Sequence, residues 1–165
     1  MTPEQFDELY TATVARMTGQ LYAMTGNLAE AQDVVQEAFV RAWQHRSDLE
    51  DTRSPEAWVR TVAWRLAISR FRRSKTAARA WGRYDVRHVD PPPEPMDPVL
   101  LAALRRLPAE QRHAVVMFHL VDLSVQDIAA EAGCPVGTIK ARLSRGRSAL
   151  AAHLNDTAYA EDRHA

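Results

Sequence analysis

The sequence predicts an all-α protein of two small helical domains joined by a proline-rich linker, with a helix-turn-helix in the second domain. Apolar residues recur at intervals of three and four, which is the period of a helix packed on one side. The segment 90–98 contains five prolines and cannot continue a helix or a central strand. We expect an N-terminal domain at 1–75, a linker at 76–97, a C-terminal domain at 98–154 and a tail at 155–165.

Charge is balanced over the 165 residues, with 21 basic and 21 acidic side chains, but it is segregated along the chain. Residues 1–52 carry 3 basic and 9 acidic side chains, whereas residues 53–88 carry 10 basic and 2 acidic ones. The remainder carries 8 and 10. This asymmetry indicates that the middle of the chain meets a polyanion and that the flanks meet other partners.

The first two helices have recognisable starts. Thr2 can cap the first helix with Gln5 completing a capping box, and Gly26 ends it. Its apolar side comprises Phe6, Leu9, Tyr10, Met17, Leu21 and Met24. Asn27 and Glu30 begin the second helix, whose inner face comprises Leu28, Ala31, Val34, Val35, Ala38, Phe39 and Ala42. The outer face shows Asp33, Gln36, Glu37, Arg41 and Gln44. Such a face is usually only solvated, but these acids could also meet a basic helix of a partner.

A third helix is predicted to begin at Ser54, after a loop at 45–53, and to run to about Ser74. Its apolar stripe is predicted to comprise Trp58, Val62, Leu66 and Ser69. Arginines and aromatics surround this stripe, namely Arg60, Trp64, Arg65, Arg70, Phe71, Arg72 and Arg73. Because bases stack on rings while guanidinium groups hold phosphates, this composition indicates single-stranded nucleic acid. We expect Trp58 in the core, whereas both the core and the binding surface remain open for Trp64.

The C-terminal domain is predicted to begin with two helices. The first carries Val99, Leu100, Ala103, Leu104 and Leu107 on its apolar side. Pro108 begins the second, with Val115, Val116, Phe118, Leu120 and Val121 mostly inward. Beyond Leu154 the chain is polar, and we expect it to fray.

Residues 124–150 have the pattern of a helix-turn-helix. Ser124 can cap a short helix, Gly133 allows a sharp turn, and Pro135 suits the start of a second helix. On that second helix Ile139 and Leu143 share one side. The other sides carry the candidate DNA contacts Thr138, Lys140, Arg142, Ser144 and Arg145, with no acid among them. An ordinary helical hairpin with a solvated basic face is the alternative.

The sequence argues against an enzyme, a metalloprotein and a membrane protein. Cys134 is the only cysteine, and the six histidines do not have the spacing of zinc ligands. The sequence has no phosphate-binding glycine loop and no nucleophile with a supporting base, so we predict neither catalysis nor a cofactor. It also has no membrane-spanning apolar run or signal peptide, which favours the cytoplasm.

Four segments resemble blocks of bacterial RNA polymerase sigma factors, and they occur in the same order. They are NLAEAQDVVQEAFVRAW at 27–43, PEAWVRTVA at 55–63, LRRLPAEQR at 104–112 and GTIKARLSRGR at 137–147. The resemblance covers about residues 4–74 and 97–154. The short chain with only two domains resembles the extracytoplasmic-function (ECF) type.

The resemblance implies the partners and the sites. The first domain would dock on the beta-prime clamp helices of core RNA polymerase through the matching positions Asp33, Gln36 and Glu37. The loop before Ser54 and the helix after it would capture the melted minus-ten element, with candidate contacts at Arg60, Trp64, Arg65, Arg72 and Arg73. The last helix would read the minus-thirty-five element of promoter DNA. The beta flap of the polymerase and an anti-sigma factor are further partners that it implies. Many ECF members have Asn in place of Arg65 and an acid in place of Ser69, so the resemblance predicts no minus-ten sequence.

One other interpretation remains from the sequence, which is a stand-alone helix-turn-helix transcriptional regulator that acts without docking on polymerase. Such a regulator would need a ligand pocket or a dimer surface in its first domain. The acidic helix at 28–44, followed by a helix rich in Arg and Trp, argues against it.

Overall fold

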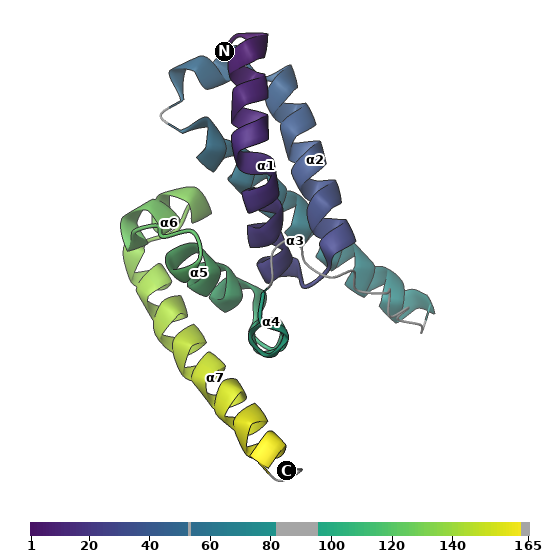
Figure 1. The fold of residues 1–165 in the computed structure, drawn as a ribbon, viewed down its shortest axis with the longest axis vertical. Coiled ribbons are helices and arrows are strands. Elements are labelled where there is room, and N and C mark those ends of the chain that lie inside the picture. The colour runs from purple at the N-terminus through teal and green to yellow at the C-terminus, as the bar shows by residue number, and fades with distance from the viewer. Residues whose placement is uncertain (53, 82–95, 163–165) are drawn as a thin grey trace. The chain divides into compact units, whose positions relative to one another are not determined.

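The computed structural model describes residues 1–52, 54–81 and 96–162. All regular structure in these residues is helical, which confirms the predicted all-α class. The chain divides into two units, Met1–Pro93 and Glu94–Ala165 (Figure 1). Most of the predicted proline-rich linker falls within residues 82–95 and lies outside the described residues.

The described residues of the N-terminal unit form three α-helices and one short 3₁₀-helix, with α2 packed against both other long helices. The elements are α1 (Pro3–Thr25), α2 (Leu28–Gln44), η1 (Asp48–Asp51) and α3 (Pro55–Trp81). The predicted starts of α1 and α2 are confirmed, because Thr2 and Gln5 form a capping box and the Asn27 side chain accepts a hydrogen bond from the Glu30 amide. Gly26 has a φ of 69°, which permits the tight turn between these helices.

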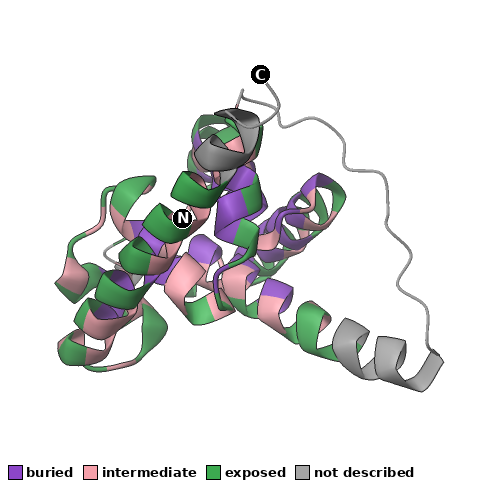
Figure 2. Cartoon of the chain, turned by 90° about the horizontal axis from the view of Figure 1, so that it is seen from below, coloured by how far each residue is buried: buried purple, intermediate pink, exposed green. Residues whose placement is uncertain are grey.

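The core of this unit is built from the inner face of α2, as the sequence predicts. All seven predicted inner residues are buried. Aromatic rings extend the packing between α1 and α2, since Phe6 meets Trp43 edge to face at 5.1 Å and Tyr10 meets Phe39 at 4.9 Å between ring centroids. Figure 2 shows buried and exposed residues alternating along the helices, as expected of helices that pack on one side.

Helix α3 differs from its prediction in both length and orientation. It continues to Trp81 rather than ending near Ser74. Its buried residues include Val59, Ala63, Leu66 and Ala67, whereas the predicted stripe residues Trp58 and Val62 are half-buried and Ser69 is exposed. The prediction followed the bulkiest side chains, whereas the buried side of α3 also contains Ala63 and Ala67, and Leu66 is the one predicted stripe residue that is buried. The expectation that Trp58 is a core residue is therefore only partly met.

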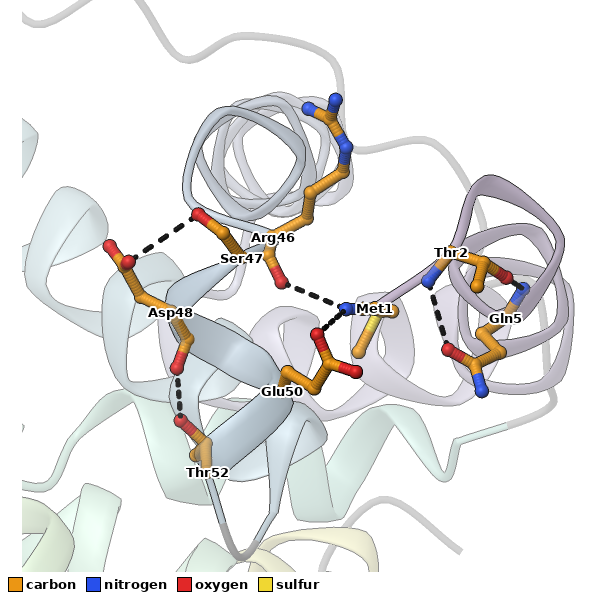
Figure 3. A network of polar contacts seen from close by, with 8 residues as sticks. All are labelled: Met1, Thr2, Gln5, Arg46, Ser47, Asp48, Glu50 and Thr52. Carbon is orange, nitrogen blue, oxygen red and sulfur yellow. Dashed lines mark hydrogen bonds and ion pairs between the residues drawn. The ribbon is translucent and has the colours of Figure 1, made fainter.

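A polar network orders the segment between α2 and α3, which the sequence predicted to be a plain loop. The Met1 ammonium group lies 3.0 Å from a carboxylate oxygen of Glu50 and donates to the Arg46 carbonyl at 3.4 Å (Figure 3). The Thr52 hydroxyl donates to the Asp48 carbonyl. These contacts join the start of α1 to η1, immediately before the chain enters α3.

The C-terminal unit consists of four helices, and the last contacts each of the other three. They are α4 (Pro98–Arg105), α5 (Ala109–His119), α6 (Val125–Ala132) and α7 (Val136–Asp162). The predicted helix-turn-helix is present as α6 and α7, with Ser124 capping α6 and Gly133 at a φ of 64°. Helix α7 continues to Asp162, so the described part of the predicted tail is helical, and the expected fraying beyond Leu154 stays a prediction.

Gly146 sits where α7 crosses α5. A β-carbon added there would lie 2.7 Å from Val115 Cγ2 and 3.3 Å from the Gln111 carbonyl oxygen. We therefore expect Gly146→Ala to lower the free energy of unfolding of the C-terminal unit by about 1–2 kcal/mol, after a helix-propensity gain of up to about 1 kcal/mol is subtracted from the overpacking cost. Urea unfolding of the full chain measures this change.

Gly137→Ala is the matched control, because a β-carbon at Gly137 would have no neighbour within 4 Å. Its free energy of unfolding should stay unchanged or rise. Equal stabilities of the two variants would contradict the close helix crossing at Gly146.

Candidate polymerase and nucleic-acid interfaces

The three residues predicted to bind polymerase lie together on the outer side of α2, and we call them the docking face. Asp33 and Gln36 are exposed, with 68% of the Asp33 side chain accessible, and Glu37 is half-buried with 36% accessible. The spacing of three and four residues places them on successive turns of one helix side. The structure thus brings these residues together as the sequence predicted.

Two arginines neutralise the docking face from within the molecule. Arg70 on α3 donates to Glu37 Oε2 at 2.7 Å, and another of its nitrogens lies 3.8 Å from Asp33 Oδ2. Arg41 donates to Glu37 Oε1 at 2.6 Å. Both oxygens of Glu37 therefore accept a hydrogen bond from a cation of the same chain. Sequence reasoning named Arg70 only as one of the arginines of the third helix.

These contacts set the protonation of Glu37. Partial burial raises the pKa of Glu37, but the hydrogen bonds from Arg70 and Arg41 lower it more, so the net pKa lies below 4.5. A lowered pKa in the folded protein means that the carboxylate stabilises the fold at neutral pH. This contribution is lost as the pH falls below 4.5 and through the lowered pKa.

The predicted minus-ten residues do not share one environment on α3. Arg65, Arg72 and Arg73 are exposed, and Arg73 donates to the Ser69 hydroxyl at 3.2 Å. Trp64 is half-buried. These four residues are available to a strand that runs along α3.

Arg60 differs from this group because it is only 5% exposed. Its guanidinium lies 3.6 Å from Glu56, which in turn binds Arg16 of α1 at 2.9 Å. This ion-pair network joins the start of α3 to α1. Burial of Arg60 argues against the direct DNA contact that the sequence predicted, because the arginine lies on the packed side of α3.

Phe71 is a candidate that the sequence reasoning did not assign to the site. It is 44% exposed and lies seven residues, or two helical turns, after Trp64. An exposed aromatic beside Arg72 and Arg73 provides a surface on which a base can stack. The sequence analysis already placed Phe71 among the residues around the apolar stripe, and its exposure in the structure is the signal that adds it to the site.

The second helix of the helix-turn-helix separates its packing residues from its polar ones. Ile139 and Leu143 are buried, as predicted from their spacing. Lys140, Ser144 and Arg145 are exposed. Thr138 is half-buried. Lys140 and Ser144, four residues apart, lie on one helix side that a DNA groove can receive, and Arg145 lies about 100° further round the helix.

Arg142 is held by its own domain. One of its nitrogens lies 3.1 Å from Glu110 Oε2 on α5, and another lies 3.8 Å from the Cys134 sulfur in the turn. Its side chain is 23% exposed. Arg142 therefore ties α7 to α5 and to the turn, and this arrangement favours a supporting role or a phosphate contact over base reading.

The described residues give no sign of a metal centre or a membrane span. Within these residues, no three His, Cys, Asp or Glu side chains are close enough together to hold a metal ion. No helix in the described part of the chain combines the length and the apolar character needed to cross a bilayer.

Comparison with known families assigns both units. The family Sigma-70 region 2 matches residues 9–77, and the family Sigma-70, region 4 matches residues 99–150. The first match contains the docking face and α3 as far as residue 77. The second contains α4 to α6 and most of α7.

Curated relatives and a solved structure agree with these matches. The chain is 34% identical to ECF RNA polymerase sigma factor SigL of Mycobacterium tuberculosis over 149 residues, covering 86% of this chain and 84% of that protein. It is 32% identical to SigW of Bacillus subtilis, covering 82% and 81%. Its fold is similar to sigma factor RpoE of Bartonella quintana, solved with the anti-sigma factor NepR, with a TM-score of 0.80, 25% identity and coverage of 92% and 98%. The chain therefore belongs to the ECF RNA polymerase sigma factors, which are not enzymes but bind core polymerase and direct promoter recognition and transcription initiation.

Proposed function

We propose that the tasks of this sigma factor are divided among three helix surfaces. The docking face of α2 binds the beta-prime clamp helices of core polymerase. The outer side of α3, with Trp64, Arg65, Arg72 and Arg73, captures the opened minus-ten strand. The start of α7 reads the minus-thirty-five element through Thr138, Lys140, Ser144 and Arg145, with Arg142 beside them.

The observation that carries this proposal is the separation of charge between α2 and α3. The acids of the docking face point outward from one helix, while exposed arginines and aromatics lie on the next. Acidic side chains suit a basic protein partner, whereas arginines interleaved with aromatics suit a single strand. A regulator acting without polymerase would use these acids only in their ion pairs with Arg70 and Arg41, and no observation favours such a regulator.

The proposed domain division keeps an N-terminal domain at 1–75, a linker at 76–97, a C-terminal domain at 98–154 and a tail at 155–165. The linker would let the two domains reach the minus-ten and minus-thirty-five elements on one polymerase, with the beta flap near the second domain. Cytoplasmic localisation follows from the need to meet polymerase and DNA. An anti-sigma factor is a proposed partner as well, because the similar RpoE structure contains one.

Run-off transcription with purified core polymerase tests the proposal as a whole. Transcripts from a promoter of this factor should appear with the protein and be missing without it. Polymerase that initiates equally well in both cases would contradict the proposal.

Trp64→Ala should impair promoter opening while leaving polymerase binding intact. A base stacked on an aromatic ring contributes about 1–3 kcal/mol, so permanganate reactivity of promoter thymines should fall roughly fivefold to a hundredfold. Trp64→Phe is the matched control, since it keeps a ring at the same position and should retain most of the reactivity. Unchanged reactivity in Trp64→Ala would place the ring outside the DNA site.

A further inference from the structure

Arg70 occupies a position between two proposed surfaces. It belongs to α3, the helix that carries the exposed arginines Arg72 and Arg73, yet its guanidinium points to the acids of the docking face on α2. Its side chain is 31% exposed, so solvent and partners can reach it. Arg70 thus contacts the acids proposed to bind polymerase, although it belongs to α3, the helix proposed to bind DNA.

The docking face is electrically neutral while Arg70 stays in place. Two carboxylates, Asp33 and Glu37, are matched by two guanidinium groups, Arg41 and Arg70. A cationic helix of a partner that binds both carboxylates must therefore displace a cation of this chain. Arg70 is the group to be displaced, because it alone of the two arginines contacts both acids in the described network.

We propose that Arg70 is an exchange cation that couples polymerase docking to DNA capture. Polymerase takes over Asp33 and Glu37, and the released guanidinium joins Arg72 and Arg73 on the phosphates of the opened strand. The proposal rests on the proposed roles of the docking face and α3. It makes the free protein a poor DNA binder and the polymerase-bound protein a better one, without a change of fold. By linkage, DNA on α3 must strengthen polymerase binding by the same factor.

The test replaces Arg70 by Gln in the full chain and measures two affinities. Binding of core polymerase should strengthen roughly twofold to fivefold, because the carboxylates no longer have an internal competitor, which is the range of partly exposed ion pairs. Binding of a forked minus-ten DNA by the reconstituted holoenzyme should weaken by a similar factor. The gain in polymerase affinity should shrink as salt rises, because screening weakens the competition.

Arg72→Gln is the matched control, as it removes the same charge two residues further along α3. It should weaken forked DNA binding while leaving polymerase affinity unchanged. Arg70→Gln is expected to raise the affinity for polymerase and to lower the affinity for forked DNA. If Arg70 were purely structural, its replacement would lower both affinities.

Three results would overturn the exchange. If the affinities for polymerase and for forked DNA both fall, Arg70 serves only to hold α3 against α2. If neither affinity changes, Arg70 is only a solvated side chain. Weaker DNA binding with unchanged polymerase affinity would make it an ordinary DNA contact. Charge reversal of Asp33 and Glu37 shows whether only the exchange is wrong or the docking face as well. If that double variant still loses polymerase, the docking role stands and only the exchange is wrong.

Discussion

The double variant Asp33→Arg with Glu37→Arg should lose core polymerase almost completely. Removing one partner of a buried charge contact costs about 2–5 kcal/mol, so affinity should fall roughly a hundredfold or more. The reversed charges would also repel Arg70 and Arg41, which Glu37 holds at 2.7 and 2.6 Å. Co-purification with core polymerase, followed by titration of labelled protein, measures the loss.

The control reverses two acids elsewhere in the same unit. Asp7→Arg with Glu8→Arg makes the same change in net charge on exposed positions of α1, away from the docking face. It should bind polymerase as the native chain does. Circular dichroism should show that both variants remain helical. If the Asp33 and Glu37 variant still co-purifies fully, the docking face is merely solvated.

Arg145→Ala should relax promoter preference at one position of the minus-thirty-five element. An arginine that reads a base edge contributes about 1–3 kcal/mol of discrimination, so preference there should fall roughly fivefold to a hundredfold. Lys140→Ala should instead weaken all templates alike and reduce the salt slope by about one, as expected of a phosphate contact. Run-off transcription on templates varied through the element measures both changes.

Arg147→Ala provides the control on the same helix. The Arg147 guanidinium lies over the Phe118 ring at 4.9 Å and donates to His119 at 3.1 Å, so it is engaged with α5. Its removal should leave sequence preference unchanged.

Arg142→Ala should lower activity on every template, because it breaks the contact with Glu110. If Arg145→Ala changes neither activity nor preference, α7 does not read the element through this residue.

Local signals predicted the helix starts well because they act within one turn. Thr2, Asn27 and Ser124 each cap the helix assigned to them, and Gly26 and Gly133 adopt the left-handed conformation that ends one. These features depend on hydrogen bonds from backbone amides to cap side chains or carbonyls three or four residues away. No knowledge of the remaining fold is needed to find them.

Features that depend on distant segments were predicted less well. The packed side of α3 is set by its contacts with α2 and α1, and Ala63 and Ala67 were not recognised as buried residues. Arg60 lies on this packed side and is buried, although the sequence predicted it to contact DNA. Arg70 and Glu37 are 33 residues apart in the sequence, and Arg142 and Glu110 are 32 apart. Periodicity within one helix cannot predict pairs between different helices.

The arrangement of α7 has a consequence for engineering new promoter specificities. The residues that fix the helix in its domain, Ile139, Leu143 and Gly146, are buried and distinct from the exposed Lys140, Ser144 and Arg145. Substitutions on the exposed side therefore leave packing untouched, and their effects on the free energy of unfolding should be small. A combinatorial library restricted to these three outward positions should yield mostly folded proteins, so orthogonal promoter and sigma factor pairs can be selected without first restoring stability.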